Sequence, residues 1–369
     1  MEPKKLETQI RKTGFVLENQ VAQILKSAGW TVISNKYYVD DFEESVREID
    51  LVAYQVQKVQ HFDVYTVLVV SCKKSESNVW ALLARDINLR DPNSDWWPLH
   101  AWTNDKALLY QLDEPGAAKR YHEGGASLGV QEALNLPSVE VFAFQEMDRS
   151  SGSPQNDKPI FSAVTSLMKA QAYELGALPL RKKAPSIYQF NLLSVVDAEL
   201  ARLMFRGDDI TATEVESEHY LARYIVKKKE TFSRIRFIRS NVFADVLKDY
   251  GRLHQANAKW FGSLCDSFYN GIMKDYRRNN VLLDDFKKLV SWELVWRIRQ
   301  TFNITVEIDS YWFHWDKEAS HVSIGLKLEG KMVDFLNGDP QFNALTKSAL
   351  EKIYRYAGSF VFEVDDIPF

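Results

Sequence analysis

The sequence predicts an α/β protein, and three observations carry this prediction. Residues 6–28 repeat apolar side chains at helical spacing. Two runs of alternating apolar residues, 46–54 and 65–72, flank a polar segment and predict an antiparallel hairpin. Further along the chain, 160–175 has helical spacing and 187–196 has the composition of a buried strand. A helix, a set of strands, a second helix and another strand therefore follow one another.

The first helix has an apolar stripe on one face. The stripe consists of Leu17, Val21, Ile24, Leu25 and Ala28. At 100° per residue, Glu18 falls on the rim of this stripe, where its carboxylate can look toward the sheet against which the helix packs. A strand is expected next, over 30–39, because this segment is rich in aromatic and β-branched residues.

The hairpin brings an acid and a lysine together. With the turn near Gln60, Asp50 lies opposite Val70 and Ser71. Side chains alternate along a strand, so Ser71 and Lys73 share one face. We therefore expect Asp50 and Lys73 at the same edge of the sheet.

A long interruption, about 78–157, separates the hairpin from the second helix. Within it, we expect a short helix over 80–87 and a strand over 139–144. The segment 122–125, His-Glu-Gly-Gly, does not have the spacing of a phosphate-binding loop and is expected to be a flexible connection. After the second helix and its strand, 220–238 contains two further strand patterns.

The pattern changes after Ser240, where we place a domain boundary between 1–240 and 241–369. The second domain is expected to be α+β, of unassigned role. Its predicted helices are 241–276, 283–302 and 343–357, and its predicted strands are 304–308, 311–315, 322–328 and 359–364.

Composition restricts the class of protein. The 369 residues are 46% hydrophobic and 26% charged, as in globular proteins, and no apolar run reaches the roughly 20 residues that span a bilayer. Two cysteines, Cys72 and Cys265, cannot form a disulfide framework, so we expect a cytoplasmic protein. With a net charge of −4, any contact with nucleic acid needs a local basic patch. Candidate patches are Lys73–Lys74, Arg181–Lys183, Lys227–Lys229, and Arg234 with Arg236 and Arg239.

The arrangement of a helix Glu, an Asp in the second strand and a Lys ending the third strand resembles the PD-(D/E)XK nucleases, and the Mrr-like restriction endonucleases most. Here it reads Glu18, then Arg-Glu-Ile-Asp at 47–50, then Val-Val-Ser-Cys-Lys-Lys at 69–74. The resemblance covers roughly the first 75 residues and, after the insertion, 157–200. It implies a restriction-endonuclease-like αβββαβ core within 1–240.

The same resemblance implies a metal-dependent endonuclease that hydrolyses DNA phosphodiester bonds. Glu18, Asp50 and the backbone carbonyl of Cys72 would bind Mg²⁺ or Mn²⁺, because hard oxygen ligands suit these ions. Lys73 would orient the attacking water. Double-stranded DNA is the expected substrate, in restriction or phage defence. A homodimer is expected where both strands are cut.

Ser71 departs from the resemblance, because the family has Glu, Asp or Gln at this position. One interpretation is that the missing carboxylate has moved to Asp86, thirteen positions after Lys73. A second is that Glu48 or Glu76 replaces it, or that the site works with two acids. A third is that cleavage is lost and the domain serves as a nucleic-acid-binding or assembly module, or that Ser71 is an introduced inactivating change.

Overall fold

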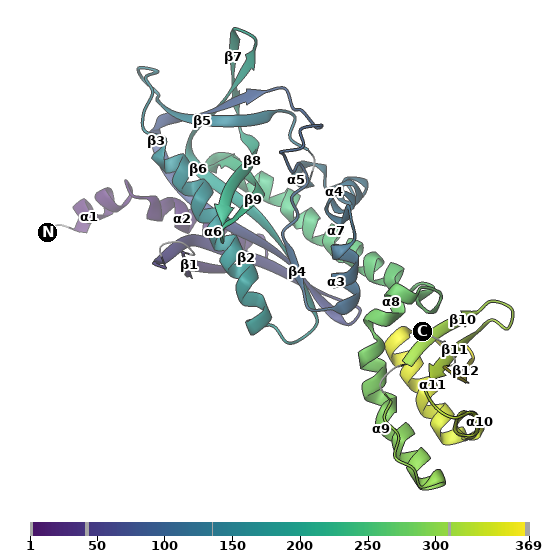
Figure 1. The fold of residues 1–369 in the computed structure, drawn as a ribbon. Coiled ribbons are helices and arrows are strands. Elements are labelled where there is room, and N and C mark those ends of the chain that lie inside the picture. The colour runs from purple at the N-terminus through teal and green to yellow at the C-terminus, as the bar shows by residue number, and fades with distance from the viewer. Residues whose placement is uncertain (1–2, 41–43, 135, 309–310, 366–369) are drawn as a thin grey trace. The chain divides into compact units, whose positions relative to one another are not determined.

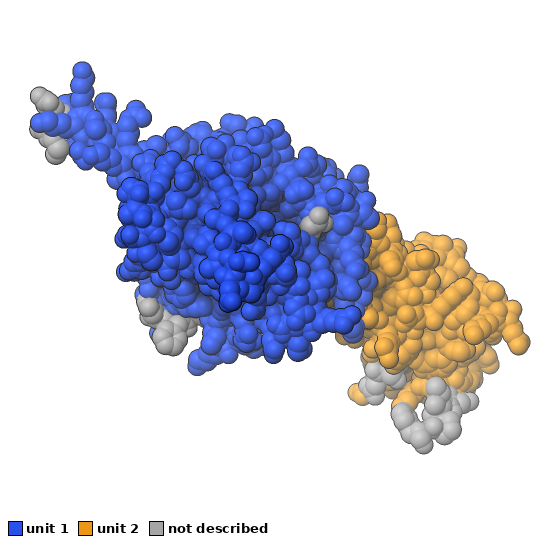
Figure 2. Space-filling view, turned by 90° about the horizontal axis from the view of Figure 1, so that it is seen from above, with its two compact units in different colours: residues 1–105, 115–262 blue, residues 106–114, 263–369 orange. Residues whose placement is uncertain are grey.

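A computed structural model describes residues 3–40, 44–134, 136–308 and 311–365, and it confirms the α/β class. The chain divides into two compact units, coloured separately in Figure 2. The first comprises 1–105 and 115–262, and the second comprises 106–114 and 263–369.

The division falls later in the chain than the boundary expected near Ser240. Helix α7, Phe243–Tyr269, contributes its residues up to Gly262 to the first unit. His254 and Asn257 of this helix hydrogen-bond the buried Thr66 hydroxyl in the sheet, at 3.1 and 2.8 Å. A helical pattern alone does not show on which unit its residues pack, so the sequence placed the boundary too early.

A mixed sheet organises the first unit, with nine strands in the described part of the chain. They are β1 Thr31–Val39, β2 Val46–Val59, β3 Phe62–Arg85, β4 Ala101–Thr103, β5 Glu140–Asp148, β6 Ser186–Arg206, β7 Asp209–Val215, β8 Ser217–Val226 and β9 Lys229–Arg239. The main path is β1-β2-β3-β6-β9-β8. Strands β1, β2 and β3 form an antiparallel meander, whereas β3, β6 and β9 run parallel.

Helices cover both faces of this sheet (Figure 1). The helices of this unit are α2 Gly14–Ser27, α4 Ala117–Ser127, α5 Gln131–Leu134, α6 Lys158–Arg181 and the first part of α7, which the short 3₁₀ turn Ser240–Val242 precedes. Helix α1, Pro3–Ile10, buries no residue and projects away from the sheet. Helix α6 packs its Leu167 into a core with Val67, whereas α7 contacts Thr66. Because Thr66 and Val67 point to opposite faces of β3, α6 and α7 lie on opposite sides of the sheet. Helix α2 lies beside α7, where Ile24 and Leu247 line one groove.

The predicted elements of the core are present in the predicted order, with two differences at their ends. The helix predicted over 6–28 is broken at 11–13 into α1 and α2. The short helix predicted over 80–87 is wrong, because β3 continues to Arg85 between β5 and β6. Trp80 is fully buried there. Pairing on both sides of the strand overrides its weak helical spacing, and the insertion expected from about residue 78 begins only after Arg85.

The glycine pair in 122–125 belongs to helix α4 rather than to a flexible loop, so this prediction is wrong. A methyl group placed on Gly124 would lie 2.0 Å from Cζ3 of Trp260 on α7. A methyl group on Gly125 would lie 2.2 Å from Cδ1 of Leu134. The missing side chains let α4 pack closely against its neighbours.

The second unit combines helices with a small sheet, as predicted. The described strands are β10 Tyr311–Asp316, β11 His321–Leu326 and β12 Phe360–Val364, with helices α3 Lys106–Asp113, α8 Tyr276–Val281, α9 Leu283–Phe302, α10 Gly330–Gly338 and α11 Pro340–Tyr354, and a 3₁₀ turn, Ile272–Lys274. A core around Phe286 and Phe313 joins the helices to the sheet. The strand predicted over 304–308 is wrong, because these residues form no regular element, and α10 was not predicted. Within the described residues, none of the helices is long and apolar enough to span a bilayer.

Candidate functional site

The β2–β3 hairpin places Asp50 beside the end of the apolar part of β3. Its register pairs Leu51 with Val70, and the turn follows Val59, as the sequence predicted. The Asp50 carboxylate reaches across the pair, where its Oδ2 accepts the backbone N–H of Cys72 at 2.6 Å. The same oxygen accepts the Ser71 hydroxyl at 3.3 Å. The other oxygen, Oδ1, makes no hydrogen bond with the residues that the structure describes, so it is available to a ligand.

Asp50 and Lys73 line one cleft of about 580 Å³ between the sheet and helix α6. Glu48, two positions before Asp50 on the same face of β2, lines it as well. The Lys73 ammonium makes no hydrogen bond or ion pair with any residue that the structure describes. A half-buried lysine without a partner is poised to meet an anionic ligand.

Glu18, on helix α2, is not among the residues that line this cleft, but its carboxylate interacts electrostatically with three that do. Its pKa is raised by partial burial first, and then by the negative charges of Asp50 and Glu48, while Lys73 lowers it. The structure therefore brings the charges of Glu18, Asp50 and Lys73 within range of one another. The start of α2 is held near β3 because the Lys74 ammonium donates to the Arg11 carbonyl at 2.8 Å.

The three acids considered as replacements at Ser71 differ in where they lie. Asp86 is not near the site: it follows Lys73 by thirteen residues, roughly 40 Å along β3. Its carboxylate is 77% exposed and faces Arg206. Glu76 is 64% exposed and pairs with Lys74 at 3.0 Å. Glu48 is the replacement that lines the cleft. The prediction for Asp86 is wrong because β3 continues as a strand, and no helix follows Lys73 to bring Asp86 back to the site.

Cys72 turns its side chain away from the cleft, as expected from strand alternation. The thiol is 5% exposed, and burial, followed by the charge of Asp50, raises its pKa well above the ordinary value. The thiol is therefore neutral and packs in the core. Only the backbone carbonyl of Cys72 remains as a ligand candidate.

The oxygen ligands available here fit a hard metal ion. Two carboxylates with mutually unfavourable charge suit a hard cation such as Mg²⁺, which keeps several waters and needs few protein ligands. The described residues contain no group of three or more His, Cys, Asp or Glu side chains arranged to hold a metal. Glu18, Asp50 and the Cys72 carbonyl would hold the ion.

Polar residues of helix α6 form the opposite wall of the cleft, and sequence reasoning missed them. They are Lys158, Ser162, Thr165, Ser166 and Lys169. Their spacing of four, three, one and three residues makes a polar stripe beside the apolar stripe of the same helix. That stripe is the signal that would have revealed them. The Lys158 ammonium has no hydrogen bond or ion pair in the described structure.

A buried ion pair fixes the mouth of the cleft. Asp40 is 2% exposed, and its Oδ2 accepts the Lys169 ammonium at 2.7 Å. The Arg47 guanidinium lies 3.9 Å from the same oxygen. Lys169 thus ties the end of β1 to α6, which holds the two walls of the cleft at a set distance.

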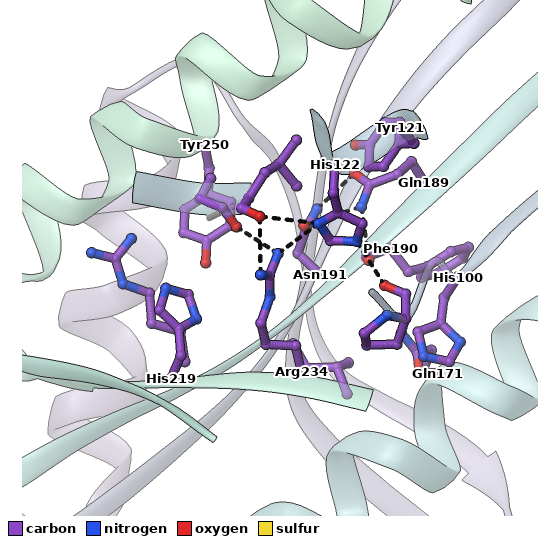
Figure 3. A pocket seen from close by; sticks show the side chains of 15 residues that line it. His100, Tyr121, His122, Gln171, Gln189, Phe190, Asn191, His219, Arg234 and Tyr250 are labelled. Carbon is purple, nitrogen blue, oxygen red and sulfur yellow. Dashed lines mark hydrogen bonds between the residues drawn. The ribbon is translucent and has the colours of Figure 1, made fainter. Parts of the chain in front are cut away.

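The arginines of β9 do not form the open basic patch considered from the sequence. Arg236 is 6% exposed and donates to Asp249 at 3.0 Å, and Arg239 pairs with Glu214. Arg234 donates to the carbonyls of Ala133 and Leu134, at 3.0 and 3.1 Å (Figure 3). These side chains stabilise the interior and are not offered to phosphate.

Arg234 lies in a small cavity of about 30 Å³, the volume of about one water molecule. Burial lowers its pKa to about 10. Burial, with the charge of Arg234, lowers the pKa of the neighbouring His122 to about 4, so this imidazole is neutral at pH 7. Figure 3 shows His100 and His219 around the same cavity. The cavity is too small for an organic substrate, so we assign it a structural role.

Comparisons with known proteins give no further assignment: no family model, no curated protein and no solved structure matches the chain.

Proposed function

We propose that the chain is a metal-dependent nuclease that hydrolyses phosphodiester bonds in DNA, built on a restriction-endonuclease-like core. One observation supports the proposal: Asp50 and Lys73, from two strands, line one cleft, and the Glu18 carboxylate on helix α2 interacts electrostatically with both. The cations of α6 opposite them supply attraction for a phosphate backbone, which the net charge of −4 does not.

Each residue has a defined part in this proposal. Asp50 and Glu18 would hold the metal, and the two hydrogen bonds to Asp50 Oδ2 fix the orientation of that carboxylate. A bound Mg²⁺ would neutralise charge on the phosphate and lower the pKa of its water. Lys73 holds the attacking water and stabilises the negative charge that develops on it. Lys158 binds a neighbouring phosphate as a point charge.

Glu48 is the acid that compensates for Ser71 in this proposal. Its Oε1 accepts the Asn35 amide at 2.6 Å, which fixes the side chain beside the cleft. We place the activity in the cytoplasm, as restriction or phage defence on double-stranded DNA, with a homodimer where both strands are cut.

The proposal is tested by a nuclease assay on plasmid DNA with a panel of divalent ions. Cleavage is expected with Mg²⁺ or Mn²⁺ and is expected to disappear in EDTA. Asp50→Ala and Lys73→Ala should abolish it, whereas Asp86→Ala, the matched control remote from the cleft, should leave it unchanged. Cleavage by the Asp50 and Lys73 variants at the wild-type rate would defeat the proposal.

A binding module without cleavage is the second candidate, and two observations favour it. Ser71 supplies no carboxylate, and one oxygen of Asp50 is already engaged by two donors. This candidate predicts DNA binding that is unchanged by EDTA, and no cleavage with any ion. The same plasmid assay, run beside a gel-shift measurement, separates the two candidates.

A further inference from the structure

A second cavity, of about 190 Å³, lies under the other half of helix α6, on the same face of the sheet as the cleft. Tyr54 on β2, Tyr65 on β3 and Tyr188 on β6 form its aromatic wall. The rings of Tyr65 and Tyr188 stack with centroids 4.1 Å apart and 5° between their planes. Flat aromatic walls of this kind bind planar groups by stacking.

Three cations and one carboxylate complete the lining: Lys36, Arg181, Lys182 and Glu174. The Lys182 ammonium already lies over the rings of Tyr65 and Tyr188, 4.6 and 5.5 Å from their centroids. The cation–π position is therefore filled by the protein itself, so a cationic ligand would be repelled. A neutral planar group attached to an anion suits the cavity better.

Glu174 adds a specific acceptor. The residue is 7% exposed, and its Oε2 accepts Lys36 at 2.8 Å and Arg181 at 3.1 Å. Its Oε1 has no hydrogen-bond partner among the residues that the structure describes. This carboxylate oxygen is able to accept a hydrogen bond, so a ligand N–H would be favoured beside it. The exocyclic amino group of cytosine is such a donor, and thymine lacks it.

Size and position narrow the ligand further. The cavity is smaller than the roughly 300–1,000 Å³ of pockets for drug-sized molecules, so it admits one heterocycle rather than a whole nucleotide. Val52 and Tyr54 line it, two and four positions after Asp50 on the same strand, which is roughly 7 and 13 Å away. At ~3.4 Å per nucleotide along one strand, this span corresponds to about two to four nucleotides.

We propose that this aromatic cavity receives one unstacked nucleobase with an exocyclic amino group, cytosine before thymine, from a DNA strand bound in the cleft. The inference rests on the proposed function only in requiring that the chain binds DNA, with or without cleavage. The base replaces the Lys182 ammonium over the rings of Tyr65 and Tyr188, Glu174 accepts a hydrogen bond from the amino group, and the displaced Lys182 meets an adjoining phosphate.

The test measures binding of fluorescein-labelled dC12 and dT12 in Mg²⁺ by fluorescence anisotropy, with Lys73→Gln in every protein so that the DNA stays intact. Tyr65→Ala is expected to weaken dC12 binding about 5- to 140-fold. Tyr65→Phe keeps the ring and should bind nearly as the parent. Tyr37→Ala is the matched control, since Tyr37 lies in β1 and is 62% exposed. Glu174→Gln should remove the preference for dC12 over dT12.

An abasic site moved along dC12 gives a measurement that needs no further variant. The parent protein should lose affinity when the missing base falls at one position, and Tyr65→Ala should not respond there. Equal affinity at every position, or unchanged dC12 binding by a folded Tyr65→Ala protein, overturns the base pocket alone. If the parent protein binds no DNA, the proposed function is overturned as well. If the missing base lowers affinity but the protein does not cleave DNA, the base pocket is upheld and the nuclease activity is excluded.

Discussion

Ser71→Glu restores the acid that the resemblance expects, at a position that is 1% exposed. The Ser71 hydroxyl lies 3.3 Å from Asp50 Oδ2, so a carboxylate there would come within about 4 Å of the Asp50 charge. At an effective dielectric constant of 20, two like charges at 4 Å repel by about 4 kcal/mol. Without metal, the substitution should lower the melting temperature by about 8–16 °C.

Magnesium should reverse this loss. An ion at 100 times its dissociation constant stabilises the folded protein by about 2.7 kcal/mol, or roughly 5–11 °C. The assay is thermal unfolding in EDTA and in a MgCl₂ series, followed by a cleavage assay on plasmid DNA. We expect the Mg²⁺-dependent rise to be larger for Ser71→Glu than for the wild type, with cleavage gained or increased.

Ser71→Gln is the control, because it has nearly the same size without the charge. It should lose stability through crowding alone and show no additional response to Mg²⁺. If Ser71→Glu and Ser71→Gln respond equally to Mg²⁺, the acids beside Ser71 do not form a cation site, and the reasoning about the cleft is refuted.

Three further predictions use other residues. Lys73→Gln should reduce cleavage about 10²–10³-fold while leaving the melting temperature nearly unchanged, because its ammonium bonds no described residue; a large loss of stability would contradict this. Because the pKa of Glu18 is raised above 4.5 in the folded protein, ionising this carboxyl group costs folding stability as pH rises above 4.5. Glu18→Gln should therefore increase the free energy of unfolding of the metal-free protein, measured in urea, at pH 7 and not at pH 4. A methyl group at Gly251 meets nothing within 4 Å, so Gly251→Ala should stabilise the folded protein by about 1 kcal/mol through helix propensity. In Gly124→Ala the methyl group would meet Trp260, which should cost about 1–3 kcal/mol of stability and offset that gain. Equal melting temperatures for the two variants would contradict the packing argument.

The short-range features of the core were predictable because periodicity encodes burial directly. The hairpin register follows from two apolar runs and a two-residue turn, and it sufficed to place Asp50 beside Ser71. The same reasoning assigned α9 its observed ends, Leu283 and Phe302. Such patterns depend only on which side of an element faces the interior.

Features that depend on distant partners were not predictable in this way. The segment from Trp80 to Arg85 is a strand because β5 and β6 pair with it, and both lie far along the chain. The glycines of α4 looked like a loop because the partner of Gly124, Trp260, is more than 130 residues away. Asp86 was misplaced by the same error, since its position depended on a helix that does not form.

The residues that the sheet contributes to the candidate site could be predicted from the sequence, whereas those of helix α6 could not. Glu18, Asp50 and Lys73 stand out because acids and a lysine interrupt apolar patterns. Lys158 and Lys169 do not, since lysines on an amphipathic helix are ordinarily solvated. The polar stripe borders the cleft only because α6 crosses over the sheet in the folded protein.

The length of α6 has a mechanical consequence. It runs without interruption from Lys158 to Arg181, so at ~1.5 Å per residue it is a rod of roughly 36 Å. One end borders the cleft and the other borders the aromatic cavity. The Lys169–Asp40 ion pair and the buried Leu167 hold the middle of this rod against the sheet, so α6 keeps the cleft and the aromatic cavity at a fixed separation.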